Sequence, residues 1–345
     1  MVKLFHEQLS LNITGEMRKT LIFALLMAHS IVGFTQELPD NFSEFTIRSA
    51  SDNLPISVLT AGTATPPKAV VQLVHGMCEH KERYIAFMQY LTEKGYACVI
   101  HDHRGHGESV LFENDLGYFY SGGYRAMVED VKMVTDYMKK QYPGLKLFLF
   151  GHSMGSMVVR SYTKLFDDEI DGLIVCGSPS YSAGSKFGKG IAKRIAKRKG
   201  EHFRSAKLQK LSFGSFNKKF PEATSPNAWV CSDKQIVEKY DADSKCNFVF
   251  TANGFRNLYE LMGDAYSKNN WKTGQPDLPI WFISGQEDPC LISLSKFNKA
   301  VKRMRTVGYR NVDAKLYPNM RHEILNEIGK EEVWNDIATK LDSWR

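Results

Sequence analysis

A chain of 345 residues is long enough for one large domain with an insertion, or for two modest domains. Hydrophobic residues make up 43% and charged residues 24%, which are globular values that exclude wholesale disorder, collagen and a coiled coil. The net charge of +7 is local, because residues 181–220 contain 12 Lys or Arg and one acid, Glu201, which leaves the rest of the chain net negative. Such a patch suits an anionic surface but does not indicate a nucleic-acid-binding protein.

The N-terminal segment, residues 1–40, has two interpretations. Met17-Arg18-Lys19 precedes residues 20–36, which contain no Asp, Glu, Lys or Arg. A basic start and an apolar run resemble a signal peptide, with residues 1–16 as an upstream extension. The run lacks a clean small-x-small cleavage site and is too short for a convincing transmembrane helix. The pattern favours export, to the periplasm or the exterior, over a docked N-terminal helix in a cytoplasmic protein.

Apolar strands and amphipathic helices alternate from residue 41 onwards. The predicted strands are residues 44–49, 56–61, 68–75, 96–101, 145–150, 171–176, 278–284 and 312–317. The predicted helices are residues 82–94, 122–141, 154–166, 254–268, 291–306 and 331–344. Apolar strands that alternate with helices are typical of the α/β class, with a mostly parallel central sheet flanked by helices.

The alternation stops between the sixth and seventh predicted strands. Residues 181–250 are first basic and then rich in Pro, Asn and Ser, and they show no clear strand. We predict that this segment is a mainly helical cap, or lid, inserted into one α/β core that consists of residues 41–180 and 251–345.

The strongest motif is the sequence Gly-His-Ser-Met-Gly at residues 151–155, which lies between a predicted strand and a predicted helix. In this G-x-S-x-G context a tight turn presents the serine at the carboxyl edge of the sheet, next to the positive end of a helix. Ser153 is therefore the candidate nucleophile. The alternative is a turn of small residues that lets a helix pack closely on the sheet.

A serine needs a general base, and the base needs an orienting acid. His322 follows the strand at residues 312–317, which is where this architecture places its base. Asp288 follows the strand at residues 278–284 and is the candidate acid, with Glu287 as the alternative. The order Ser, Asp, His along the chain is that of α/β-hydrolases.

Two backbone amides are candidates for the oxyanion hole. One is the N–H of Met154, directly after the nucleophile, and the other is the N–H of Met77, after the strand at residues 68–75. The histidine-rich residues 101–109 look like a metal site, but they lack a matching ligand cluster, and serine chemistry requires no metal or cofactor. We interpret them as a hydrogen-bonded loop beneath the active site.

These motifs together resemble serine α/β-hydrolases of the monoacylglycerol lipase and lysophospholipase type. The resemblance spans roughly residues 44–344 and rests on residues 75–80, 83–84, 102–109, 151–155, 285 with 288, and 321–323. It implies an α/β-hydrolase fold with a cap over the pocket, ester hydrolysis and no cofactor. It also implies Ser153, Asp288 and His322 as the triad, and Met77 and Met154 as the oxyanion donors. The basic insertion and the possible leader depart from the family pattern.

The expected activity is hydrolysis of monoacyl lipid esters, either a monoacylglycerol or a lysophospholipid. One alternative is an aminopeptidase-type α/β-hydrolase, which needs an acidic cap group to hold a free amine, and residues 181–220 offer only Glu201. The other is a non-catalytic module that binds a lipid or a signal molecule, which an intact Ser/Asp/His set disfavours.

The basic segment predicts a further contact. If it is helical, its apolar residues and its lysines fall on different sides, and the helix can lie on an anionic membrane. These residues are Phe187, Ile191 and Ile195 on one side, and Lys186, Lys189, Lys193 and Lys197 on the other. The alternative is a solvated lid whose lysines keep it soluble. No nucleic-acid-binding motif accompanies the charge, and the sequence leaves the oligomeric state open.

Overall fold

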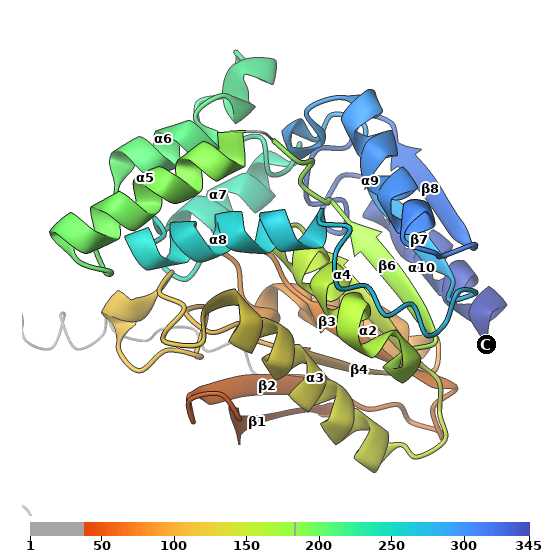
Figure 1. Ribbon diagram of the computed structural model, residues 1–345. Helices are drawn as coiled ribbons and strands as arrows, with labels where there is room; N and C mark the ends of the chain where they lie inside the picture. Colours follow the sequence, from red (N-terminus) through yellow and green to blue (C-terminus); the bar gives the residue numbers. More distant parts are fainter. Residues whose placement is uncertain (1–37, 183) are drawn as a thin grey trace, which may run out of the picture. The chain divides into compact units, whose positions relative to one another are not determined.

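The computed structural model describes residues 38–182 and 184–345 (Figure 1). The expected leader at residues 17–36 lies outside the described residues. Within them, no helix combines the length and the apolar character that crossing a bilayer requires.

In the unit Asn41–Arg345, eight strands form one sheet in the order β1-β2-β4-β3-β5-β6-β7-β8. The strands are β1 (Phe42–Arg48), β2 (Pro55–Ala61), β3 (Ala69–Val74), β4 (Tyr96–His101), β5 (Leu147–His152), β6 (Gly172–Cys176), β7 (Ile280–Gly285) and β8 (Val312–Tyr317). β2 runs antiparallel to both of its neighbours, and the strands from β4 to β8 pair in parallel. This architecture confirms the predicted α/β class.

Helices cover both faces of the sheet. Its central strands, β3 to β7, are therefore buried throughout. α3 (Gly123–Gln141), α4 (Met154–Phe166) and α9 (Leu294–Thr306) share one core with one face. α2 (Ile85–Glu93) and α10 (Lys330–Trp344) lie on the other face, where Phe87 packs against Phe150 and Trp334.

Two helices start three residues later than the sequence predicts, for local reasons. The helix expected at residues 82–94 starts as a 3-10 turn, η1 (Lys81–Tyr84), before α2. The helix expected from residue 291 starts at Leu294, after a second such turn, η5 (Pro289–Leu291), because Ile292 has a φ of 59°. The side chain of Ser293 then accepts a hydrogen bond from the N–H of Lys296 and caps the helix.

The segment between β6 and β7 is mainly helical. It contains α5 (Gly184–Lys199), α6 (Ala206–Phe213), the short η4 (Phe216–Lys219) and α7 (Lys234–Ala242), and it continues into α8 (Ala252–Ala265). Figure 1 shows these green to cyan helices gathered at one end of the sheet. α5 packs closely on α8, and a Cβ at Gly188 would collide with the ring of Tyr259. The role of residues 181–250 as a cap stays a prediction.

Candidate active site

Ser153 lies on a sharp turn between β5 and α4. Its φ of 51° and ψ of −117° are unusual for a residue with a side chain. Such strain is a feature of the turn that presents a nucleophile at the edge of a sheet. Gly155 permits the turn, because a Cβ there would collide with the carbonyl oxygens of Val74 and His75. The motif at residues 151–155 thus has the strand–turn–helix context that its sequence predicts.

The structure brings the three predicted triad side chains together, each from the carboxyl end of a different parallel strand. His322 Nε2 lies 2.8 Å from Ser153 Oγ, and His322 Nδ1 lies 2.9 Å from Asp288 Oδ2. Asp288 is fully buried, whereas the neighbouring Glu287 is exposed. The acid in contact with His322 is therefore Asp288 and not the alternative, Glu287.

The surroundings of Asp288 keep it ionised. Burial alone would raise the pKa of this carboxyl group, but the charge and the hydrogen bond of His322 outweigh burial and lower it. The carboxylate also accepts hydrogen bonds from the N–H of Cys290, at 2.8 Å, and from Ser284 Oγ, at 3.0 Å. These bonds fix its orientation toward the His322 ring.

The two predicted oxyanion donors flank Ser153. Met154 is the first residue of α4, and Met77 lies in the loop after β3. That loop comes so close to the nucleophile that a Cβ at Gly76 would lie 2.8 Å from Ser153 Cβ. Within residues 38–182 and 184–345, neither amide donates to a protein acceptor. Both N–H groups therefore remain free to bind a developing oxyanion.

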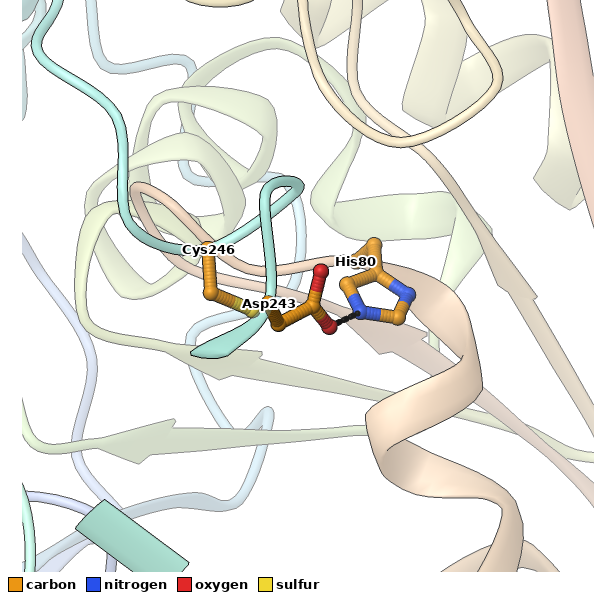
Figure 2. Close-up of side chains that lie close together, drawn as sticks. All are labelled: His80, Asp243 and Cys246. Atoms are coloured by element: carbon orange, nitrogen blue, oxygen red, sulfur yellow. Dashed lines mark hydrogen bonds and ion pairs between the residues drawn. The ribbon is translucent and has the colours of Figure 1, made fainter. Parts of the chain in front are cut away.

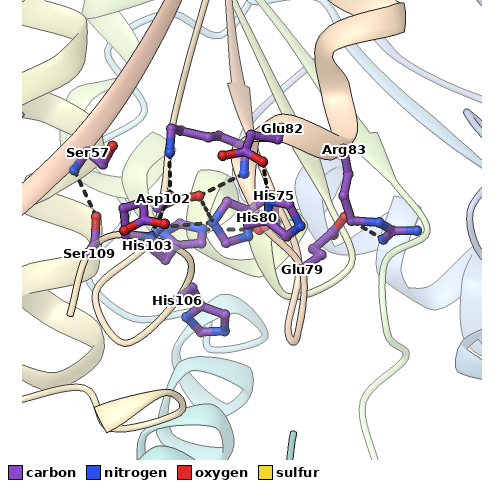
Figure 3. Close-up of polar contacts among 12 residues, drawn as sticks. Ser57, His75, Glu79, His80, Glu82, Arg83, Asp102, His103, His106 and Ser109 are labelled. Atoms are coloured by element: carbon purple, nitrogen blue, oxygen red, sulfur yellow. Dashed lines mark hydrogen bonds and ion pairs between the residues drawn. The ribbon is translucent and has the colours of Figure 1, made fainter. Parts of the chain in front are cut away.

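The histidine-rich residues 101–109 form a hydrogen-bonded support for this loop (Figure 3). The buried carboxylate of Asp102 accepts bonds from the backbone N–H and the Nζ of Lys81, at 2.7 and 2.9 Å. The N–H of His103 donates to His75 Nε2 at 2.9 Å. Burial would raise the pKa of Asp102, but Lys81 and His75 lower it. In the described part of the chain, no histidine of residues 101–109 belongs to a cluster tight enough to hold a metal.

A second contact ties the end of the insertion to the same loop (Figure 2). His80 Nε2 lies 2.9 Å from Asp243 Oδ2, and the hydrogen bond from His80 lowers the pKa of Asp243 to about 2. Cys246 completes a group of three potential metal ligands. A metal would have to displace this hydrogen bond and ionise a thiol whose pKa is raised by burial. We therefore interpret the group as a structural link.

Sequence reasoning missed an aromatic side chain that the insertion places against the base. The ring of Trp229 lies 5.1 Å from that of His322. Phe213 and Phe216 pack on Trp229, with ring centroids at 6.3 and 4.9 Å, and all three rings are only partly buried. The aromatic residues of this otherwise polar stretch could have suggested an apolar contact. Their contact with His322 could not be predicted, because more than 90 residues separate them from it in the sequence.

A family model described as "Serine aminopeptidase, S33" matches residues 65–329. The chain belongs to this family. It is 25% identical to a monoacylglycerol lipase of Mycolicibacterium smegmatis over 282 residues, which is 81% of this chain and 90% of that protein. It is 38% identical to human monoglyceride lipase over 92 residues, 27% of this chain and 29% of that one.

Comparison with solved structures agrees on the fold. A thermostable carboxyl esterase from Bacillus coagulans superposes with a TM-score of 0.81 at 25% identity, over 88% of this chain and 99% of that chain. A soluble variant of monoglyceride lipase from Saccharomyces cerevisiae gives a TM-score of 0.66 at 19% identity, over 90% and 97% of the two chains. This protein is an α/β-hydrolase of the monoglyceride lipase type, as its motifs indicated.

Proposed function

We propose that the protein is a serine carboxylester hydrolase that cleaves monoacyl lipid esters, a monoacylglycerol or a lysophospholipid, through a Ser-His-Asp triad and an acyl-enzyme. The observation that carries the proposal is the hydrogen-bonded chain from Ser153 Oγ through His322 to buried Asp288. Similarity to the monoacylglycerol lipase of M. smegmatis over 90% of its length supports ester chemistry. The mechanism requires no metal or cofactor.

In this mechanism His322 accepts the proton of Ser153 while Oγ attacks the ester carbonyl. The N–H groups of Met77 and Met154 stabilise the oxyanion that forms. His322 then protonates the leaving alcohol, which leaves the acyl group on Ser153. Finally His322 activates a water that releases the fatty acid, while ionised Asp288 holds the imidazole in orientation and stabilises its protonated form.

The aromatic cluster of Trp229, Phe213 and Phe216 supports an apolar acyl group in the substrate. These rings are incompletely buried, and Trp229 adjoins the base, so an acyl chain that lies against them would remove apolar surface from water. The link between His80 and Asp243 fixes the other end of the insertion near Met77. The insertion thus contacts the site at two places, in keeping with a cap.

The aminopeptidase alternative has less support from the residues, although the family takes its name from that activity. A free substrate amine needs a carboxylate to bind it. Glu201, the acid of residues 181–220, already pairs with Arg256 at 2.8 Å and accepts a bond from Asn253 at 2.9 Å. Release of p-nitroaniline from aminoacyl p-nitroanilides by the wild-type protein would favour the alternative.

The Ser153→Ala variant tests the proposed function. The wild type should hydrolyse p-nitrophenyl esters, a monoacylglycerol or a lysophospholipid, and should react with a fluorophosphonate probe. The variant should lose labelling and roughly 10⁶-fold of its turnover while its circular dichroism stays unchanged. Labelling of the variant, or residual turnover above a few per cent, would rule out Ser153 as the nucleophile. A wild type that neither turns over nor reacts would favour a binding module.

A further inference from the structure

A buried pair of charged groups lies directly behind the nucleophile. His152, the residue before Ser153, is buried, and its Nδ1 lies 2.8 Å from Glu79 Oε1. Its other ring nitrogen, Nε2, lies 3.3 Å from the backbone carbonyl oxygen of His322. Glu79 also accepts the N–H of Gly76. One imidazole thus joins the strand end that carries the nucleophile, the loop that carries an oxyanion donor and the loop that carries the base.

The partners of the ring dictate its protonation. A carbonyl oxygen only accepts hydrogen bonds, so Nε2 must carry a proton to bind His322. Glu79 is surrounded by donors, namely the N–H of Gly76, the hydroxyl of Tyr84 at 3.3 Å and Nη1 of Arg83 at 3.4 Å. A carboxyl group among so many donors is ionised, and an ionised carboxylate only accepts. Nδ1 must therefore carry a proton as well.

We propose that Glu79 holds His152 as an imidazolium, and that this doubly donating ring positions His322 and the oxyanion loop, so that loss of its proton lowers turnover on the alkaline side. His152 is a positioning residue, because it contacts two catalytic segments and takes no part in bond making. The proposal rests on the proposed function for its activity readout alone.

The surrounding charges agree with this assignment. Burial would lower the pKa of His152, but the charge and the hydrogen bond of Glu79 outweigh burial and raise it. Burial would likewise raise the pKa of Glu79, yet His152 and Arg83 lower it. The titratable groups that face the pair are Arg83 and Tyr84 from η1, Cys176 on β6, His75 at the end of β3, and His322 and Glu323 after β8.

A second ion pair closes the network. Arg83 donates two hydrogen bonds to Glu323, at 2.6 and 2.7 Å, and so ties η1 to the residue that follows the base. A cavity of about 10 Å³, with room for about one water, lies among Glu79, Arg83, His152 and Glu323. The space is too small for a substrate, so the network supports the site from behind.

The direction of the pH effect follows from these shifts. Below its raised pKa, His152 keeps both protons and both contacts. As the pH rises through that pKa, one proton leaves, and either the bond to Glu79 or the bond to the His322 carbonyl is lost. Turnover should therefore fall as the pH rises through that pKa, on the side opposite to the loss caused by protonation of the base.

The first experiment compares pH profiles of kcat for a soluble p-nitrophenyl ester in three folded proteins. In Glu79→Gln the imidazolium loses its anionic partner, so the fall of kcat at alkaline pH should move to lower pH, with KM little changed. Glu327→Gln is the matched control, because Glu327, like Glu79, is a buried carboxylate that accepts a backbone N–H. Glu327 lies in the loop after β8 and accepts the N–H of Arg321 at 2.8 Å. Its alkaline fall should coincide with that of the wild type.

The second experiment removes the titrating group. His152→Gln keeps an N–H donor in reach of the His322 carbonyl but cannot ionise, so its kcat should be lower by up to about 100-fold, without an alkaline fall. Titration of the His152 ring nitrogens by NMR provides a readout that does not depend on activity. A ring that titrates no higher than a free imidazole, an alkaline fall that persists in His152→Gln, or an equal shift in Glu79→Gln and Glu327→Gln would overturn the proposal.

Discussion

Two adjacent carboxylates show how the surroundings of a residue decide its role. Glu287 and Asp288 follow β7 together, and composition alone does not separate them. The chain turns so that Glu287 faces solvent, whereas Asp288 is enclosed and receives bonds from His322, Ser284 and the N–H of Cys290. An acid that must stabilise an imidazolium needs this second environment.

Asp288→Asn should therefore reduce kcat by about 10⁴-fold, because an amide favours the wrong tautomer of His322. Glu287→Gln should change kcat less than a few-fold, since its side chain is exposed to solvent. Steady-state kinetics with one p-nitrophenyl ester compares the two variants directly. The opposite ranking would assign the acid to Glu287.

We propose that the insertion influences substrate choice through Trp229, whose ring lies 5.1 Å from that of His322. Trp229→Ala should raise KM for long-chain esters by about 10-fold or more, because burial of an aromatic ring contributes about 1.5–3 kcal/mol. KM for a two-carbon ester should change little. Trp271→Ala is the control, since Trp271 packs on Tyr309 and lies outside the aromatic cluster at the base. A chain-length effect of equal size in both variants would argue against an acyl site at Trp229.

Among the elements, α4 connects the nucleophile to α8. Its first turn follows Ser153, and its last turns bury two cations, Arg160 and Lys164, against the end of α8. Arg160 Nη2 donates to the carbonyl of Ala265 at 2.9 Å, and Lys164 Nζ donates to the carboxylate of Asp264 at 3.0 Å. Cations at a helix C-terminus satisfy its free carbonyls and its negative partial charge.

Lys164→Met should consequently lower the free energy of unfolding by about 2 kcal/mol, because it removes charged hydrogen bonds and leaves partly buried acceptors without them. Urea denaturation monitored by circular dichroism measures the change. Lys340→Met removes a surface ion pair with the exposed Asp313 and should cost less than about 1 kcal/mol. Equal losses in the two variants would show that the contact with α8 adds no more than a surface pair.

The sequence predicts the elements well where a local pattern specifies them. The alternation of apolar strands and helices identifies the sheet strands and the helices that cover it, and the G-x-S-x-G motif identifies the turn at Ser153. Contacts made by distant residues have no such pattern. Trp229 and the pair of Glu79 and His152 come together only when the sheet order β3-β5-β6 and the insertion are in place.

At the scale of the whole molecule, charge and chemistry occupy different parts of the chain. Ser153, Asp288 and His322 lie on the sheet framework, whereas the net positive charge is concentrated in residues 181–220 of the insertion. The exposed cations of α5 are Lys186, Lys189, Lys193, Arg194, Lys197, Arg198 and Lys199. Within the described residues, none of them takes part in an ion pair. Cations on one helix that have no acidic partner among the described residues make an anionic surface the natural complement.

The packing of α5 differs from the sequence prediction in one respect. The buried side of α5 consists of small residues, Ser185, Gly188, Ala192 and Ala196, which allow close approach to α8. The expected apolar side is only partly used, because Ile191 and Ile195 are half-buried and Phe187 is 70% exposed. An exposed aromatic ring beside lysines is the composition of a helix that lies on a membrane surface.

We therefore propose that α5 contacts anionic membranes, and that Lys193→Glu/Lys197→Glu weakens this contact. Each lysine near such a surface contributes about 1 kcal/mol at low salt, so binding to phosphatidylserine vesicles should fall by about 30-fold or more. Lys299→Glu/Lys302→Glu on α9 changes the net charge equally and should have a smaller effect. Hydrolysis of a soluble short-chain ester should be the same in both, because all four side chains are exposed on the surface of α5 and α9.

Salt distinguishes this contact from simple apolar adsorption, because a shorter screening length weakens attraction between exposed charges. Co-sedimentation of the wild type with phosphatidylserine vesicles should therefore be strong at low salt and decline toward 0.5 M NaCl, with little binding to neutral phosphatidylcholine. Equal loss in the α5 and α9 variants would reduce the effect to overall charge. Absence of binding at low salt, or binding indifferent to salt, would leave α5 as a solvated lid whose lysines serve solubility alone.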